Sequence, residues 1–130
     1  MKRSAVLIAA LLLLSVIATS ASAQVLNARG RLTLLRVHDL GTNFGPPNDV
    51  LEAEVVIAID TEPSKFFGFQ LRNDANLPVR QAMFDLLRDA FARNLPVNID
   101  FRQVAGRNNS VLFRVWLTPP PPSPGPVVVQ

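Results

Sequence analysis

The sequence has 130 residues, 48% of them hydrophobic and 18% charged, which suits a single domain with a buried core. It contains no cysteine and one histidine, so it excludes a disulfide scaffold, a thiol nucleophile, a cysteine-ligated zinc and a site built on two histidines. The formal net charge of +3 includes Lys2 and Arg3. The other 11 basic and 10 acidic residues nearly cancel, so we predict no nucleic-acid partner.

Residues 1–23 have the features of a secretory signal peptide. A positively charged start precedes an apolar run of 13 residues over 5–17, and Ala21 and Ala23 form the small-residue pattern that signal peptidase cleaves. The run is shorter than the roughly 20 residues that span a bilayer. We therefore expect cleavage before Gln24, a secreted or periplasmic mature protein, and no stable membrane insertion after cleavage.

The domain is expected over 30–118, after a short N-terminal segment, 24–29. Its first predicted strand, 31–38, changes phase partway, because its apolar residues lie on one face up to Leu34 and on the other from Leu35. One extra residue at this point, a β-bulge, restores a single buried face and bends the strand. A bent first strand can take part in two sheets.

Alternating apolar and polar residues predict two further strands, over 49–60 and 65–72. In the first of them, Glu52 and Glu54 project from the same polar face, about 7 Å apart. Two carboxylates at this spacing are compatible with a calcium site or with the acid pair of a glycosidase. A solvated polar face is the commoner alternative, so we assign no metal site and no catalytic residue.

One helix is predicted after the third strand. Pro78 suits its first turn and Asn94 suits its C-cap. Phe84 falls outside the apolar stripe of this helix and is expected to be an exposed interface residue. The residues of the stripe recur at the spacing of one helical face: Val79, Ala82, Met83, Leu86, Leu87, Ala90 and Phe91.

Two strands, 97–102 and 111–117, complete the domain as a hairpin with a short loop of turn-forming residues. Alternation along the last strand places Leu112 and Trp116 on the outward face. Exposed large apolar residues of this kind are typical of protein interfaces. We therefore assign Leu112, together with Phe84, to an interface and expect a homo-oligomer.

Residues 119–130 form a proline-rich tail. Because proline fixes φ and lacks a backbone donor, we predict a disordered tail with extended polyproline II geometry. The tail can serve as a ligand for an aromatic groove or as a spacer, or it can lack a selected role.

The predicted order is strand, strand, strand, helix, strand, strand. A bent first strand, five strands and a helix between the third and fourth resemble the OB-fold, which implies a mainly β protein with a five-stranded OB-like barrel. Among exported bacterial proteins, the order over 30–118 resembles the pentameric B subunits of AB-type enterotoxins. Those subunits hold a disulfide that this chain cannot make, and no family residues are transferred to it. A small α+β roll and a cystatin-like sheet are the alternatives.

The OB-fold resemblance draws attention to the loop over 39–48, because the loop after the first strand borders the ligand surface of that fold. Its two asparagines can hydrogen-bond to sugar hydroxyls or to a peptide backbone, and its phenylalanine can stack on a ligand. The alternative is that this ring plugs the end of the barrel. If the loop and the last strand share a rim, the ligand-binding residues are Asn43, Phe44, Asn48, Arg114 and Trp116.

His38 stands beside Asp39, and a histidine–carboxylate pair can act as an acid–base device. No serine has a spacing that completes a nucleophilic triad, and a surface histidine is the simpler interpretation. We therefore predict an exported, non-enzymatic, self-associating binding module for a glycan or an exported protein, with no cofactor. The alternative is a small secreted hydrolase that uses His38 with Asp39 or Glu52 with Glu54.

Overall fold

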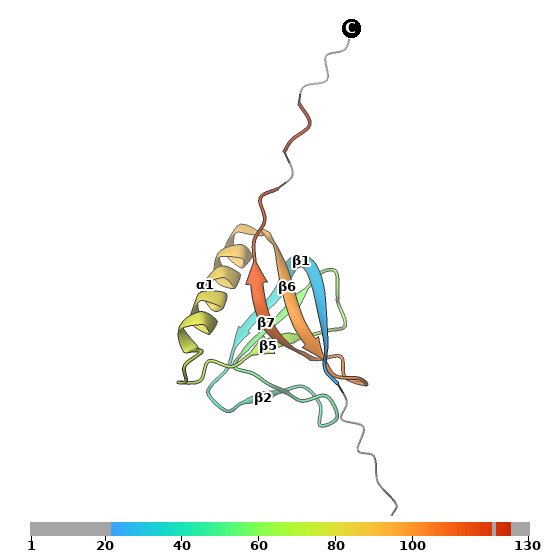
Figure 1. Cartoon of the computed structure of the whole chain (residues 1–130), viewed down its shortest axis with the longest axis vertical. Helices are drawn as coiled ribbons and strands as arrows, with labels where there is room; N and C mark the ends of the chain where they lie inside the picture. Colours follow the sequence, from blue (N-terminus) through green and yellow to red (C-terminus); the bar gives the residue numbers. More distant parts are fainter. Residues whose placement is uncertain (1–21, 121, 126–130) are drawn as a thin grey trace, which may run out of the picture.

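The computed structural model describes residues 22–120 and 122–125, so nearly all of the predicted signal peptide lies outside the described residues. Five strands form a closed barrel, and a single helix follows the third of them (Figure 1). Around the barrel the strands are β1 (Gln24–Val37), β4 (Val55–Ile59), β5 (Phe67–Phe69), β7 (Ser110–Trp116) and β6 (Pro96–Gln103). The helix is α1 (Leu77–Arg93), and two short strands, β2 (Asn43–Phe44) and β3 (Leu51–Glu52), pair separately.

The predicted fold class is confirmed: the protein is mainly β, with one helix between the third and fourth barrel strands. All neighbouring barrel strands are antiparallel except β5 and β7, which are parallel. This five-stranded mixed barrel is consistent with an OB-like fold. The strand predicted over 49–60 is interrupted at Ala53 and Glu54, and its two parts are β3 and β4.

β1 is a long bent strand that pairs with two partners. Residues 24–31 pair with β6, whereas residues from Leu32 onward pair with β4. The register shifts between Leu32 and Leu34, so the predicted bulge exists but lies slightly earlier than expected. The segment 24–29, which was expected to precede the domain, is part of this strand. Near the bend, a Cβ on Gly30 would lie 2.5 Å from the Asp60 carboxylate and 2.7 Å from the Thr61 hydroxyl, so both side chains would have to shift to admit one.

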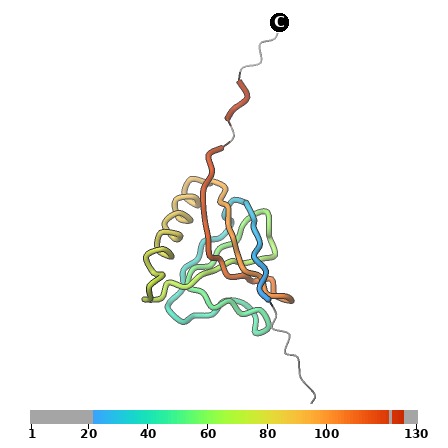
Figure 2. The backbone as a smooth tube through the Cα atoms, viewed as in Figure 1, coloured from blue at the N-terminus to red at the C-terminus, as the bar shows by residue number. Residues whose placement is uncertain are grey.

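The core fills the barrel and continues under α1, which lies along one side of the barrel beside β7 (Figure 2). The rings of Phe67 and Phe101 meet edge to face, with centroids 4.7 Å apart. The helix contributes three buried side chains, Met83, Leu87 and Ala90. Asn94 adopts the left-handed conformation that ends the helix, as its sequence position predicted.

The predicted apolar stripe of α1 is only partly buried. Val79, Leu86 and Phe91 are exposed, whereas Phe84 packs against the core. Phe84 is therefore half-buried and not fully exposed as expected, and its interface role stays a prediction. The apolar stripe is wider than the surface of the barrel that α1 covers. Which of its residues are buried therefore depends on the strands that lie under the helix.

The expectation that Leu112 points outward is also wrong, since its side chain is 1% exposed and belongs to the core. Leu112 pairs with Phe101, but Arg114 pairs with Asp100, so Phe113 is an extra residue on β7. This bulge breaks the strict alternation on which the expectation rested. Because its side chain is buried, Leu112 cannot form an exposed interface contact.

Beyond β7, the described part of the tail has no helix or strand and leads away from the barrel (Figure 1). Residues 121 and 126–130 lie outside the described residues, and polyproline II geometry of the tail stays a prediction. Within the described ranges, no helix has the length and apolar character that crossing a membrane requires.

Candidate binding cleft

The seam between β5 and β7 is the shortest in the barrel. These strands pair only at Phe67 with Ser110 and at Gly68 with Val111. The rest of β7, residues 112–116, has a strand neighbour only in β6, and α1 lies beside it (Figure 1). At the N-terminal end of α1 this seam opens into a cleft of about 600 Å³.

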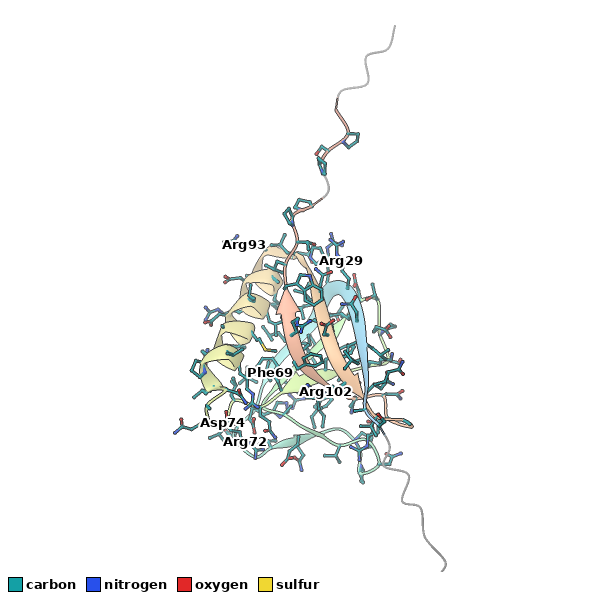
Figure 3. The ribbon with its side chains drawn as sticks, viewed as in Figure 1. Arg29, Phe69, Arg72, Asp74, Arg93 and Arg102 are labelled. Atoms are coloured by element: carbon teal, nitrogen blue, oxygen red, sulfur yellow. The ribbon has the colours of Figure 1, made fainter. Side chains whose placement is uncertain are left out.

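The cleft combines an apolar floor with a polar rim. Four of its lining side chains are buried core residues: Leu51, Phe69, Met83 and Leu112. The rim includes three arginines from three different elements: Arg80 of α1, Arg102 of β6 and Arg107 of the β6–β7 loop. Figure 3 labels Phe69 and Arg102, which line the cleft from opposite sides of the seam.

The three rim arginines differ in their ionic partners. Arg80 pairs with Asp74, with nitrogen and oxygen 3.0 Å apart. Arg102 stacks over the ring of Phe113, 4.2 Å from its centroid, and Arg107 donates a 3.5 Å hydrogen bond to the carbonyl of Val50. Neither of these two forms an ion pair with a carboxylate of the described residues. Their positive charge is therefore uncompensated at the rim.

Two loops that line the cleft are joined to each other through Asp49. Its carboxylate accepts hydrogen bonds from the backbone N–H groups of Asn108 and Asn109, each at 3.1 Å. The Asn109 side-chain amide donates back to the Asp49 carbonyl at 2.7 Å. Gly45 packs beside this junction with φ of +98°, and a Cβ there would lie 2.6 Å from Asn109. The loop after β1 and the β6–β7 loop thus form one preorganised wall.

The connection between β5 and α1 forms a second wall and is held by Glu54. This carboxylate accepts hydrogen bonds from the backbone N–H groups of Gly41 and Leu71, at 3.0 and 2.9 Å, and from Arg72 Nε at 3.1 Å. Burial by itself raises the pKa of Glu54, but these donors and the charge of Arg72 outweigh it, so the pKa lies below its usual value. Buried and ionised, Glu54 therefore holds the loop after β1 to the connection between β5 and α1. We call this set of contacts the Glu54 clamp.

Alternation along the strand placed Glu54 on a solvated face, so its buried contacts were not predicted from the sequence. The sequence did contain a signal of burial, because the five residues of β4 that follow Glu54, 55–59, are all apolar. Such a run indicates a strand covered on both faces, so an adjacent glutamate is covered too.

The five predicted ligand-binding residues do not form one patch. Asn43, Phe44 and Asn48 lie on the loop at the end of the barrel where β2 is drawn, whereas β7 carries Arg114 and Trp116 toward the other end (Figure 1). None of the five lines the cleft.

Each group has its own surroundings. Phe44 meets Phe66 with ring centroids 4.8 Å apart and packs on the small apolar cluster around Leu51. This agrees with the alternative in which Phe44 plugs the barrel end. On β7, Arg114 pairs with Asp100 at 2.8 Å, and Trp116 is half-buried. These arrangements are those of structural contacts, and the ligand-binding roles stay predictions.

The sequence offers two candidate acid–base pairs, His38 with Asp39 and Glu52 with Glu54, and no side-chain hydrogen bond joins the members of either pair among the described residues. The His38 ring packs against Phe44, and its buried Nε2 has no hydrogen-bond partner among the described residues, Asp39 included. Glu52 and Glu54 both contact Arg72. Although burial raises the pKa of Glu54, its backbone donors and the charge of Arg72 lower it below its usual value, which favours the ionised form over the protonated form that a glycosidase acid needs. Within the described part of the chain, no three histidine, aspartate or glutamate side chains are grouped to hold a metal ion.

A second groove of about 750 Å³ lies at the opposite end of the barrel, near Arg29, which Figure 3 labels. Its walls include Leu95 and Leu117 but also Pro119 and Pro120, the first residues of the tail. A wall made by a segment that leads away from the barrel is less preorganised than the clamped loops of the first cleft. The first cleft is therefore the stronger candidate site.

Comparison of this chain with protein-family models, with curated proteins and with solved structures finds no significant match. The function is accordingly inferred from the chemistry of the cleft.

Proposed function

We propose that this protein is an exported, non-enzymatic binding module that holds a segment of another exported protein in the cleft beside α1. The observation that supports this most is a preorganised cleft with an apolar floor below two uncompensated arginines. Its position between the loop after the first strand and the last hairpin loop corresponds to the ligand surface of OB-folds. The resemblance in element order to the B subunits of enterotoxins is in keeping with a binding role.

A protein segment fits the cleft better than a glycan does. The buried floor is made of aliphatic and thioether side chains together with Phe69, which suit apolar side chains of a ligand. The Phe113 ring carries Arg102 and the Asn109 amide is bonded to Asp49, so neither is free to hold a sugar, and only the amides of Gln70 and Asn76 among the lining residues are open to one. A glycan ligand is the alternative outcome of the test.

Self-association remains part of the proposal, on a revised set of residues. Leu112 is buried and Phe84 packs against the core, so we assign the contact between copies to two exposed apolar residues of α1, Leu86 and Phe91. Light scattering on the mature chain at increasing concentration measures it. A strict monomer over the whole range would remove this part while leaving the cleft proposal intact.

The cleft proposal is tested by selecting short peptides from a random display library against the mature protein and measuring their Kd by calorimetry. Val79 and Val111 line the cleft and are 63% and 47% exposed. Val79→Asp and Val111→Asp therefore change the cleft without placing a charge in the buried core. Val37→Asp and Leu40→Asp, at 53% and 69% exposure outside the cleft, are matched controls.

We expect the cleft variants to weaken peptide binding about tenfold and the controls to leave it unchanged. Peptides that bind all four variants equally would place the binding surface elsewhere. If no peptide is selected and a glycan array instead gives binding that Val111→Asp abolishes, then the ligand class is wrong.

A further inference from the structure

We infer that the segment bound in this cleft is acidic, with carboxylates that meet Arg102 and Arg107 and an apolar side chain between them that reaches the floor. This inference rests on the proposed function and specifies the partner's chemistry. It follows from the charged side chains that line the cleft, which are three arginines and one glutamate.

Glu52 is the only acidic residue that lines the cleft, against three arginines. Glu52 shares the cationic Arg72, at 3.5 Å, with Glu54, which lies at 3.1 Å, and Arg80 has its anionic partner in Asp74. Arg102 and Arg107 are left without an ion pair among the described residues, and both have exposed side chains beside a largely buried apolar floor. Anionic groups of a ligand would complete this charge pattern without displacing an existing ion pair.

The guanidinium of Arg102 is positioned in advance for such a contact. The bulge in β7 turns Phe113 toward Arg102, and the ring supports the guanidinium face at 4.2 Å. Stacking on an aromatic ring uses the face of the guanidinium and leaves its in-plane N–H donors for a carboxylate. Arg114 lies 5.8 Å from the same ring but is already paired with Asp100. The same ring thus contacts one neutralised and one available arginine.

Arg107 is held on the clamped loop. Its carbonyl accepts a 2.9 Å hydrogen bond from the Gln103 side chain, and the next two residues bond to Asp49. Because the loop is fixed in this way, little backbone order is lost when the side chain engages a ligand. Arg102 and Arg107 therefore present two positive groups from a rigid frame, with the apolar floor next to them.

The test compares two fluorescent nine-residue peptides in polarisation titrations with the mature protein. One places Asp and Glu on both sides of a central Leu-Phe pair, and the other carries Asn and Gln at the same positions. Arg102→Gln and Arg107→Gln each remove one rim charge. Arg114→Gln and Arg29→Gln remove one charge of the same kind outside the cleft. Titrations at 50 mM and 300 mM NaCl report the ionic contribution.

We expect the acidic peptide to bind at least about tenfold more tightly than its amide counterpart. We expect each cleft variant to weaken it about threefold to tenfold, the controls to change it less than twofold, and added salt to reduce the difference. Equal binding of both peptides would overturn this inference and leave the proposed function standing.

Failure of both peptides, together with failure of peptide selection, would overturn the proposed function as well. The acidic peptide is also challenged with a sulfated polysaccharide and with a single-stranded oligonucleotide. Displacement by either at a lower concentration than by unlabelled acidic peptide would show that the cleft selects polyanions, and the assignment to an acidic protein segment would be wrong.

Discussion

Glu54 and Arg72 form an ion pair, with Oε1 and Nε 3.1 Å apart, in which the Glu54 side chain is 1% exposed and the Arg72 side chain 37%. The same carboxylate receives two backbone N–H groups, one from the loop after β1 and one from the segment before α1. One side chain therefore joins two of the walls of the cleft, and its removal affects stability and binding together.

Glu54→Gln is expected to lower the free energy of unfolding by about 2–4 kcal/mol, because Arg72 loses its buried anionic partner and one backbone donor meets an amide N–H. Urea unfolding followed by Trp116 fluorescence measures this. Glu52→Gln removes the same charge from an exposed partner of Arg72 and should cost no more than about 0.5 kcal/mol. Equal effects of the two substitutions would contradict the clamp.

The clamp also predicts a pH dependence. The folded-state pKa of Glu54 lies below its ordinary value of 4.5, so the unfolded chain takes up the proton first as the pH falls. The stabilisation by Glu54 is complete above that ordinary value and is lost as the pH falls through the lower folded-state pKa. The unfolding midpoint of the wild type should therefore approach that of Glu54→Gln in acid. A constant difference between them from pH 7 to pH 3 would argue against an ionised Glu54.

Two glycines of the loop after β1 provide a matched pair. Gly45→Ala introduces a Cβ 2.6 Å from both the Asn109 amide and the Asp49 carbonyl, at φ of +98°, so we expect a loss of about 2 kcal/mol or more and weaker ligand binding. Gly41→Ala, at φ of +78° with open space around it, should cost only about 1 kcal/mol of backbone strain. If both variants bind ligand like the wild type, the junction does not preorganise the cleft.

The bulge in β7 is tested by two neighbouring truncations. Leu112→Ala should cost about 2–5 kcal/mol because the side chain is in the core, and Val111→Ala less than about 1 kcal/mol because its side chain is half exposed. Thermal unfolding of both variants separates the alternatives. A larger loss of stability from Val111→Ala than from Leu112→Ala would contradict the bulge and support strict alternation, in which Leu112 points outward.

Much of the fold follows from local patterns. Helix α1 was predictable because its apolar spacing, Pro78 and Asn94 all indicate the same segment. The bend in β1 was predictable because a change of phase has one simple cause, an extra residue. The bulge at Phe113 was not predictable, because apolar residues on both sides of it fit either phase.

The cleft could not be predicted from local patterns, because it is formed by contacts between segments that are distant in the sequence. Arg80, Arg102 and Arg107 come from three elements, and no spacing in the chain indicates that they share a rim. Glu54 meets Gly41 and Leu71, 13 and 17 residues away, and Asp49 meets Asn109, 60 residues away. Such pairs form only when the barrel closes.

The sequence alone thus determined the strand and helix order, the predicted export signal and the exclusion of cysteine chemistry, because these depend on periodicity, short motifs and composition. The tertiary structure decided which face of α1 is covered, where Leu112 points and which arginines lack a carboxylate partner. Burial and charge compensation are properties of neighbours in space, and in a barrel those neighbours come from strands far apart along the chain.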